Sequence, residues 1–173
     1  MATSDGQLPR EDARAIPEDL LDQFLEPFIA AACVALREWT NTDVVVRDVH
    51  FQIPDEALGE VAAGLSLIST MEGELILSCS EQTAASLAGR ILDGVQQNPE
   101  EWLIRDCLGE VANVIAGQAK ALLADTPYSF AFSTPTVVSG GGEEIRPQTD
   151  VDCVIVAFRS DVGDLALQLF LNR

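Results

Sequence analysis

The chain has 173 residues, of which 47% are hydrophobic, and its formal net charge is −18. This length predicts one domain with an apolar core, and the charge argues against nucleic acid or an anionic membrane as a partner, because both are polyanions. No apolar run is long enough to cross a bilayer and no signal peptide is recognised, so we expect a cytoplasmic protein.

The first forty residues divide into a tail and a helix. Residues 1–16 are polar, charged and without periodicity, which predicts a disordered acidic tail ahead of a single domain over residues 17–173. Apolar residues at helical spacing predict a helix over residues 17–39. Pro27 lies inside this pattern, and because proline has no amide hydrogen we expect the helix to kink or restart there.

Three strand candidates follow, recognised by β-branched residues and by partial alternation of apolar and polar positions. Helical spacing then returns over residues 81–92, where Ser80 is a candidate N-cap because its hydroxyl can accept a bond from a free helix amide. The expected strands cover residues 44–53, 62–70 and 74–80.

The second half of the chain repeats this order, with a long helix over residues 98–124 and three further strands. The repeat predicts an internally duplicated helix-plus-three-strand unit. The expected fold class is therefore α+β, with about six mostly antiparallel strands and the helices packed on one face of the sheet. The strands of this half are expected over residues 128–138, 151–159 and 164–171, with a glycine-rich loop over residues 139–144.

The four cysteines form no C-x-x-C pair, and each lies in a segment of apolar or small residues. This favours buried free thiols over disulfides or a zinc site. The cysteines are Cys33, Cys79, Cys107 and Cys153.

The long helix of the second half carries the most informative pattern. At roughly 100° per residue, an acid, another acid, an amide and a glycine share one narrow stripe. Such a stripe presents polar side chains on a rigid element, and the glycine leaves room beside them. The stripe consists of Asp106, Glu110, Asn113 and Gly117. The opposite side is expected to be buried and carries Cys107, Val111, Val114, Ile115 and Leu122.

Other chemistries have little support in the sequence. The single histidine, His50, lies in an expected strand, and no G-x-S-x-G sequence is present, which argues against a catalytic triad. The sequence contains no clustered His/Cys metal ligands, and glycines 140–142 lie between strands rather than before a helix, where phosphate is bound. Glu38 and Asn41 repeat the E-x-x-N spacing, but they sit at a helix end, and we treat this match as chance.

The stripe resembles the active-site signature of the CheC/CheX/FliY family of phosphatases. Asp106-x3-Glu110-x2-Asn113 is followed, after 21 intervening residues, by Pro135. Gly117 fits the E-x-x-N-x-x-x-G helix of that family, and the order of elements over most of the chain is similar to it. A single motif in the second half is similar to CheX, whereas CheC typically carries two.

The resemblance implies hydrolysis of the aspartyl phosphate of a CheY-like response-regulator receiver domain, in chemotaxis or related two-component signalling. It assigns the orientation of the attacking water to Asn113, and the docking of a receiver lysine to Glu110. Asp106 would hold the helix end or touch the partner, and Pro135 would stiffen a nearby strand or loop. The resemblance implies no cofactor or metal of the chain's own, because the Mg²⁺ belongs to the receiver, and it implies a homodimer.

Two other functions stay open: a non-catalytic module that binds a receiver, and a scaffold similar to the middle domain of flagellar switch proteins. The presence of both Glu110 and Asn113 favours the phosphatase. Aligning the two long helices places Glu26 near Glu110 and Ile29 near Asn113. The first half then lacks the acid–amide pair, so we expect one site.

Overall fold

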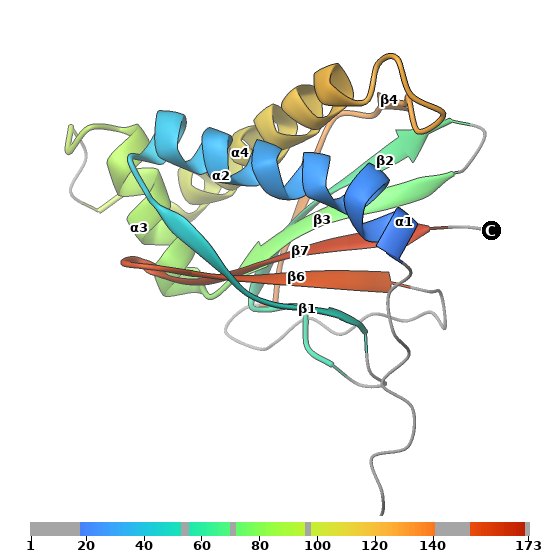
Figure 1. Cartoon of the computed structure of the whole chain (residues 1–173). Coiled ribbons are helices and arrows are strands. Elements are labelled where there is room, and N and C mark those ends of the chain that lie inside the picture. Colours follow the sequence, from blue (N-terminus) through green and yellow to red (C-terminus); the bar gives the residue numbers. More distant parts are fainter. Residues whose placement is uncertain (1–17, 53–55, 70–71, 96–97, 141–152, 172–173) are drawn as a thin grey trace, which may run out of the picture.

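The structure is a computed structural model that describes residues 18–52, 56–69, 72–95, 98–140 and 153–171. Within these residues seven strands form one antiparallel sheet, and the long helices lie together on one of its faces (Figure 1). In chain order the elements are α1 (Glu18–Leu20), the π-helical turn η1 (Leu21–Leu25), α2 (Glu26–Thr40), β1 (Val44–Phe51), β2 (Val61–Ile68), β3 (Gly73–Cys79), α3 (Glu81–Ile91), α4 (Glu101–Leu122), β4 (Ala131–Phe132), β5 (Thr136–Ser139), β6 (Cys153–Ser160) and β7 (Gly163–Leu171).

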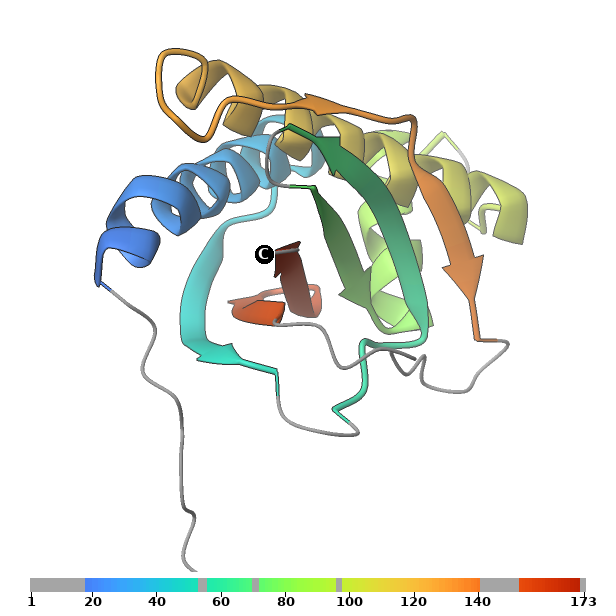
Figure 2. The same cartoon turned by 90° about the vertical axis from the view of Figure 1, so that its right-hand side faces the viewer.

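The sheet joins the two halves of the chain by exchanging strands. Its order is β1-β6-β7-β3-β2-β4, and β5 also pairs with β2. Each half contributes a hairpin, β2–β3 or β6–β7, while its first strand pairs with the hairpin of the other half. β3 and β7 meet in the middle (Figure 2). The α+β class and the duplicated unit are therefore confirmed, and the two units are interlocked.

The core lies between the helices and one face of the sheet, as strand alternation requires. Leu75 and Leu77 of β3, and Leu165, Leu167 and Leu169 of β7, all point to the helical side and are buried. Burying each such side chain contributes about 1.5–3 kcal/mol. Among the described residues, the opposite face of the sheet carries a small apolar cluster around Cys153 and Ile155 of β6 and Phe170 of β7.

The first helical segment restarts at Pro27, as the sequence predicted. The amide of Glu26 donates to the carbonyl of Leu21, one residue further back than in an α-helix, and this closes the turn η1. Pro27 then occupies the first turn of α2, where its missing amide hydrogen is not needed. α2 ends at Thr40, and its C-cap Asn41 has a positive φ of 48°.

The predicted strand over residues 128–138 is wrong in two respects, because β4 begins only at Ala131 and residues 133–135 interrupt the strand between β4 and β5. Pro135 has no amide hydrogen for the ladder, and proline also restricts the residue before it. The interruption stays attached to β2, since the amide of Ser66 donates to Ser133 Oγ at 3.0 Å and the amide of Ser133 donates to the Ser66 carbonyl at 3.0 Å.

Ser80 caps α3 as expected, because its Oγ accepts the amide of Thr83 at 3.1 Å. The predicted tail over residues 1–16, and residues 141–144 of the glycine-rich loop, lie outside the described residues. None of the helices in the described part of the chain combines the length and the apolar character needed to cross a bilayer.

Candidate functional site

The predicted stripe lies on α4, a helix of 22 residues. The side of α4 that faces the core carries Cys107, Val111 and Ile115, which are buried, and Val114 is half-buried. Leu122 was expected on the same side but is 56% exposed. It is the last residue of α4, and the next residue, Leu123, is buried in its place, so this part of the prediction is wrong.

The polar side of α4 faces outward. Asp106 and Glu110 are exposed, and Asn113 and Gly117 are half-exposed. Among the described residues, the side chains of Asp106, Glu110 and Asn113 make no hydrogen bond or ion pair. A helix anchored by its buried face thus presents an acid and an amide at the surface.

Pro135 lies beside this stripe, because α4 and the β4–β5 segment approach closely at Gly109. A Cβ built on Gly109 would stand 3.6 Å from Pro135 Cγ and 3.1 Å from Val137 Cγ2. Because Gly109 has no side chain, the segment that contains Pro135 can pack directly against the helix.

A hollow of about 250 Å³ opens between α4 and the β4–β5 segment. Two of the predicted site residues, Asp106 and Glu110, line it from the helix, and Pro135 lines it from the other side. Asn113 and Gly117 lie further along α4 and do not line this hollow. Its remaining walls are Trp102, Arg105, Gly109 and Val137.

The sequence interpretation missed Trp102, Arg105 and Gly109. Arg105 Nη2 donates to the carbonyl of Val137 at 2.7 Å and ties α4 to β5. Such a contact joins residues 32 positions apart, and periodicity along one helix carries no sign of it. Trp102 could have been found from sequence, because it lies four residues before Asp106 on the same helix face.

Gly117 has space beside it, as the sequence suggested. The nearest atom to a Cβ built there is Phe132 Cζ at 3.9 Å, which is an ordinary packing distance. One turn later, Lys120 Nζ lies over the ring of Phe132, 5.8 Å from its centre. β4 therefore borders the far end of the stripe as β5 borders its near end.

The chance match at Glu38 and Asn41 does not form a comparable stripe. Glu38 is on α2, but Asn41 has left the helix and holds a left-handed conformation. The aligned position Ile29 packs against the core rather than presenting an amide. In the described part of the chain, the acid–amide pair is thus found on α4 and is lacking at its counterpart on α2.

His50 lies between two carboxylates, with a hydrogen bond between Nε2 and Glu56, whereas its buried Nδ1 has no hydrogen-bond partner among the described residues. Its Nδ1 lies 2.9 Å from Asp48 and its Nε2 lies 2.8 Å from Glu56. Within the described residues, His, Cys, Asp and Glu side chains form no group of three or more that could hold a metal.

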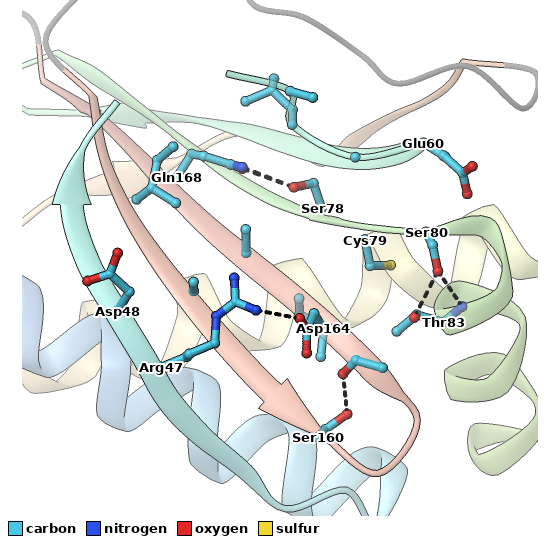
Figure 3. Close-up of a pocket in the computed structure, with 18 of the residues that line it drawn as sticks. Arg47, Asp48, Glu60, Ser78, Cys79, Ser80, Thr83, Ser160, Asp164 and Gln168 are labelled. Carbon is cyan, nitrogen blue, oxygen red and sulfur yellow. Dashed lines mark hydrogen bonds and ion pairs between the residues drawn. The ribbon is translucent and has the colours of Figure 1, made fainter. Parts of the chain in front are cut away.

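A larger hollow of about 960 Å³ lies on the sheet face opposite the helices (Figure 3). Its polar side chains pair with one another: Arg47 contacts Asp164 at 2.8 Å, and Gln168 Nε2 donates to Ser78 Oγ at 3.0 Å. This hollow is separated from the stripe by the sheet, so it takes no part in the candidate site.

The cysteines do not supply a nucleophile. All four are free, and Cys79, Cys107 and Cys153 are buried. Burial raises the pKa of the Cys107 thiol, and the neighbouring carboxylate of Asp106 raises it further. A buried thiol with a raised pKa is a poor nucleophile at neutral pH.

Comparison with known proteins places this geometry in a family. The model of the family "Chemotaxis phosphatase CheX" matches residues 61–159, which include all the predicted site residues. CheY-P phosphatase CheX of Thermotoga maritima is 28% identical over 97 residues, or 56% of this chain. The match spans 60% of the length of that relative.

Solved structures share the fold over nearly their whole length. CheX from Desulfovibrio desulfuricans has a TM-score of 0.78 and 23% identity, covering 86% of this chain and 99% of its own. CheX from Vibrio vulnificus has a TM-score of 0.76 and 24% identity, with 86% and 99% covered. CheX in the CheX–CheY–BeF3–Mg complex from Borrelia burgdorferi has a TM-score of 0.67 and 20% identity, with 87% and 98% covered. The chain therefore belongs to the chemotaxis phosphatase CheX family.

Proposed function

We propose that this protein hydrolyses the aspartyl phosphate of a CheY-like receiver domain. The observation that carries the proposal is the acid–amide pair of exposed Glu110 and half-exposed Asn113, which have no partner among the described residues, on a helix of a CheX-family chain. The relative from Thermotoga maritima is described as a CheY-P phosphatase, and the Borrelia burgdorferi structure is a complex with CheY, BeF3 and Mg. Both support a receiver as the partner.

The chemistry needs a water placed in line with the phosphorus atom. The water oxygen bonds to phosphorus, the bond from phosphorus to the receiver's aspartate oxygen breaks, and the aspartate leaves as a carboxylate while the water proton passes to the phosphate. An amide suits this task because its carbonyl can accept a hydrogen bond from the water while its NH₂ donates to a phosphoryl oxygen. We assign this role to Asn113, and the Mg²⁺ that spreads the phosphoryl charge comes with the receiver.

Glu110 has a docking role in this proposal. It precedes Asn113 by about 4.5 Å along the helix axis and lies on the same face. A carboxylate there can pair with the receiver's lysine, and this contact strengthens when the interface excludes water. The pair then fixes the register in which Asn113 enters the receiver's site. Asp106 and Pro135 shape the approach, and neither takes part in proton or phosphoryl transfer.

The decay of a phosphorylated receiver tests the proposal. CheY-like receivers from the same genome, charged with a small phosphodonor and Mg²⁺, should lose phosphate at least tenfold faster with the wild-type protein. Asn113→Ala should abolish the acceleration, whereas Asn98→Ala, which changes an exposed asparagine before α4, should retain it. Unchanged decay with every receiver, despite measurable binding, would support a non-catalytic receiver-binding or scaffold module.

We further propose a cytoplasmic homodimer, as the family resemblance implies. Within the described residues β1 pairs on one side only, with β6, and its Val45 and Val46 are 63% and 42% exposed. An unpaired apolar strand edge favours association with another chain. Light scattering coupled to size exclusion would remove this proposal if it gave the monomer mass at every concentration.

A further inference from the structure

We propose that Trp102 is a second anchor for the receiver, where the indole and Asp106 bind a Lys or Arg side chain that lies outside the receiver's phosphorylation site. This inference rests on the proposed function, because it names a further contact of the same docking helix. It concerns affinity for the receiver and assigns no chemistry to Trp102.

The indole of Trp102 is exposed and held in place. Its relative exposure is 63%, although it lies in the first turn of a helix whose other face is buried. The indole N–H donates to the carboxylate of Glu100, which fixes the ring without covering it. An exposed, oriented tryptophan loses little conformational entropy on binding, and tryptophan is among the residues enriched at the energetic centres of interfaces.

Trp102 continues the proposed docking surface. It precedes Asp106 by four residues and Glu110 by eight, so all three share one face, and it lies about 16 Å from Asn113 along the helix axis. Trp102, Asp106 and Glu110 also line the same hollow. A receiver domain of ordinary size has a radius of gyration of about 13 Å and would cover this length of helix.

The charge around the hollow selects a cation. Among the residues that line the hollow, Asp106 and Glu110 supply two carboxylates against the one guanidinium of Arg105, which donates to the carbonyl of Val137, and Glu100 accepts the indole N–H beside the hollow. The face of an indole attracts a cation, and Lys or Arg would also lay an apolar stem against the proline and valine of the far wall. A Lys or Arg of the receiver therefore satisfies both the charge and the shape of this hollow.

A binding titration tests the anchor independently of hydrolysis. The probe is a CheY-like receiver from the same genome loaded with beryllofluoride and Mg²⁺. We expect Trp102→Ala to raise Kd about five- to thirtyfold, and Trp102→Phe to raise it less, because phenylalanine keeps a weaker π-face. Trp39→Ala removes the chain's other tryptophan, which is 43% exposed on α2, and should leave Kd unchanged.

Three further measurements define the contact. At saturating phosphorylated receiver, Trp102→Ala should keep the kcat of the wild-type protein and raise only KM. Asp106→Asn should lower the dependence of Kd on salt, because it removes one charge from the interface. The receiver's surface Lys and Arg residues can be replaced one at a time. One replacement should raise Kd for the wild-type protein but change Kd little for Trp102→Ala.

The outcomes separate this inference from the proposed function. If Kd depends on Trp102 but the wild-type protein fails to speed phosphate loss, the phosphatase proposal falls and the anchor stands. Equal Kd values for wild type and Trp102→Ala, or an additive effect with every receiver variant, would overturn the anchor alone. A change of mass in light scattering without a change in Kd would assign Trp102 to contacts between copies of this chain, and would also overturn it.

Discussion

Gly109 of α4 packs against Val137 of β5 so closely that a Cβ on the glycine would stand 3.1 Å from Val137 Cγ2. Gly109 is fully enclosed in the middle of the helix, where a glycine costs about 1 kcal/mol relative to alanine. The glycine permits a close approach that places Pro135 and the hollow beside Glu110. The geometry of the candidate site thus depends on a residue with no side chain.

We expect Gly109→Ala to leave stability nearly unchanged, because its gain in helix propensity is offset by pressure on Val137, and to weaken receiver binding by displacing the wall of the hollow. Gly89→Ala on α3 is the control, since a Cβ there meets no atom within 4 Å. It should stabilise the protein by about 0.5–1 kcal/mol in urea unfolding. Equal stabilisation by both substitutions would show that α4 and β5 are not in tight contact at Gly109.

Glu110→Gln should act mainly on affinity. The substitution keeps the shape of the side chain and removes the charge that would pair with the receiver's lysine, so we expect KM to rise about tenfold, or about 1.4 kcal/mol, with a smaller change in kcat. Glu38→Gln on α2, an exposed glutamate away from the stripe, provides the matched control. A loss of kcat at unchanged KM would instead place Glu110 in the chemical step.

Periodicity alone was enough to predict α4, its polar stripe and the hairpin strands. Leu75 and Leu77 alternate with outward residues because one face of β3 packs on helices. That alternation can be recognised in the sequence of β3 alone. The exposed stripe with Glu110 and Asn113 was visible for the same reason, since α4 buries only one face.

Contacts between segments distant in sequence could not be predicted from periodicity. Arg105 donates to the carbonyl of Val137, and Gly109 packs against the same residue. Both contacts depend on how α4 and β5 pack together. The break in the strand at Pro135 follows from the missing amide hydrogen of proline. Strand-forming residues on both sides of it nevertheless predict one continuous strand. Leu122 was misplaced because the regular helix ends there and the next residue, Leu123, enters the core instead.

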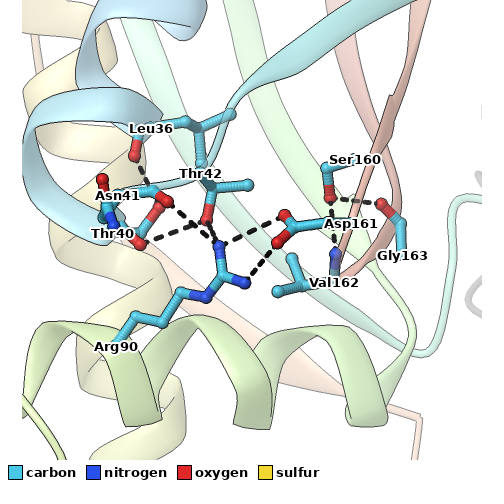
Figure 4. Close-up of polar contacts among 9 residues, drawn as sticks. All are labelled: Leu36, Thr40, Asn41, Thr42, Arg90, Ser160, Asp161, Val162 and Gly163. Carbon is cyan, nitrogen blue, oxygen red and sulfur yellow. Dashed lines mark hydrogen bonds and ion pairs between the residues drawn. The ribbon is translucent and has the colours of Figure 1, made fainter.

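Arg90 of α3 joins three parts of the fold, and removing it should destabilise the protein (Figure 4). Its guanidinium donates to Thr42 Oγ1 at 2.8 Å and to the carbonyl of Asn41 at 3.1 Å, and it pairs with Asp161 in the β6–β7 turn. Thr42 is fully buried, so we expect Arg90→Ala to cost about 1–3 kcal/mol in urea unfolding.

Arg37→Ala is the control for this measurement. Arg37 pairs with Asp43 at 2.7 Å, but both side chains are largely exposed, and such pairs contribute about 0–1 kcal/mol. The Arg90 contact also lowers the pKa of Asp161. The contribution of the Arg90–Asp161 pair to folding stability is therefore present above the pKa of an unfolded aspartate. It is lost as pH falls through the lowered pKa of Asp161. If Arg90→Ala and Arg37→Ala cost the same, the contacts of Arg90 contribute no more than an exposed ion pair.

The buried thiols should make the protein less stable in alkali. Burial raises the pKa of Cys79 to about 12, with a further contribution from Glu60, and burial likewise raises the pKa of Cys153 to about 12. Both values lie above that of an unfolded cysteine, so their contribution is complete below about pH 8.5 and declines as pH rises toward 12. The decline follows because the unfolded chain releases protons that the folded chain keeps.

Urea unfolding at a series of pH values measures this effect. Each thiol should contribute a loss of at most about 1.4 kcal/mol per pH unit above pH 9. The variant with Cys79→Ala and Cys153→Ala should start lower at pH 7, because it leaves small cavities, but should lose stability less steeply above pH 9. Parallel curves for the two proteins would contradict the raised pKa values, and rapid modification of Cys79 or Cys153 in the folded wild-type protein by a thiol reagent at pH 8 would contradict the burial of these cysteines.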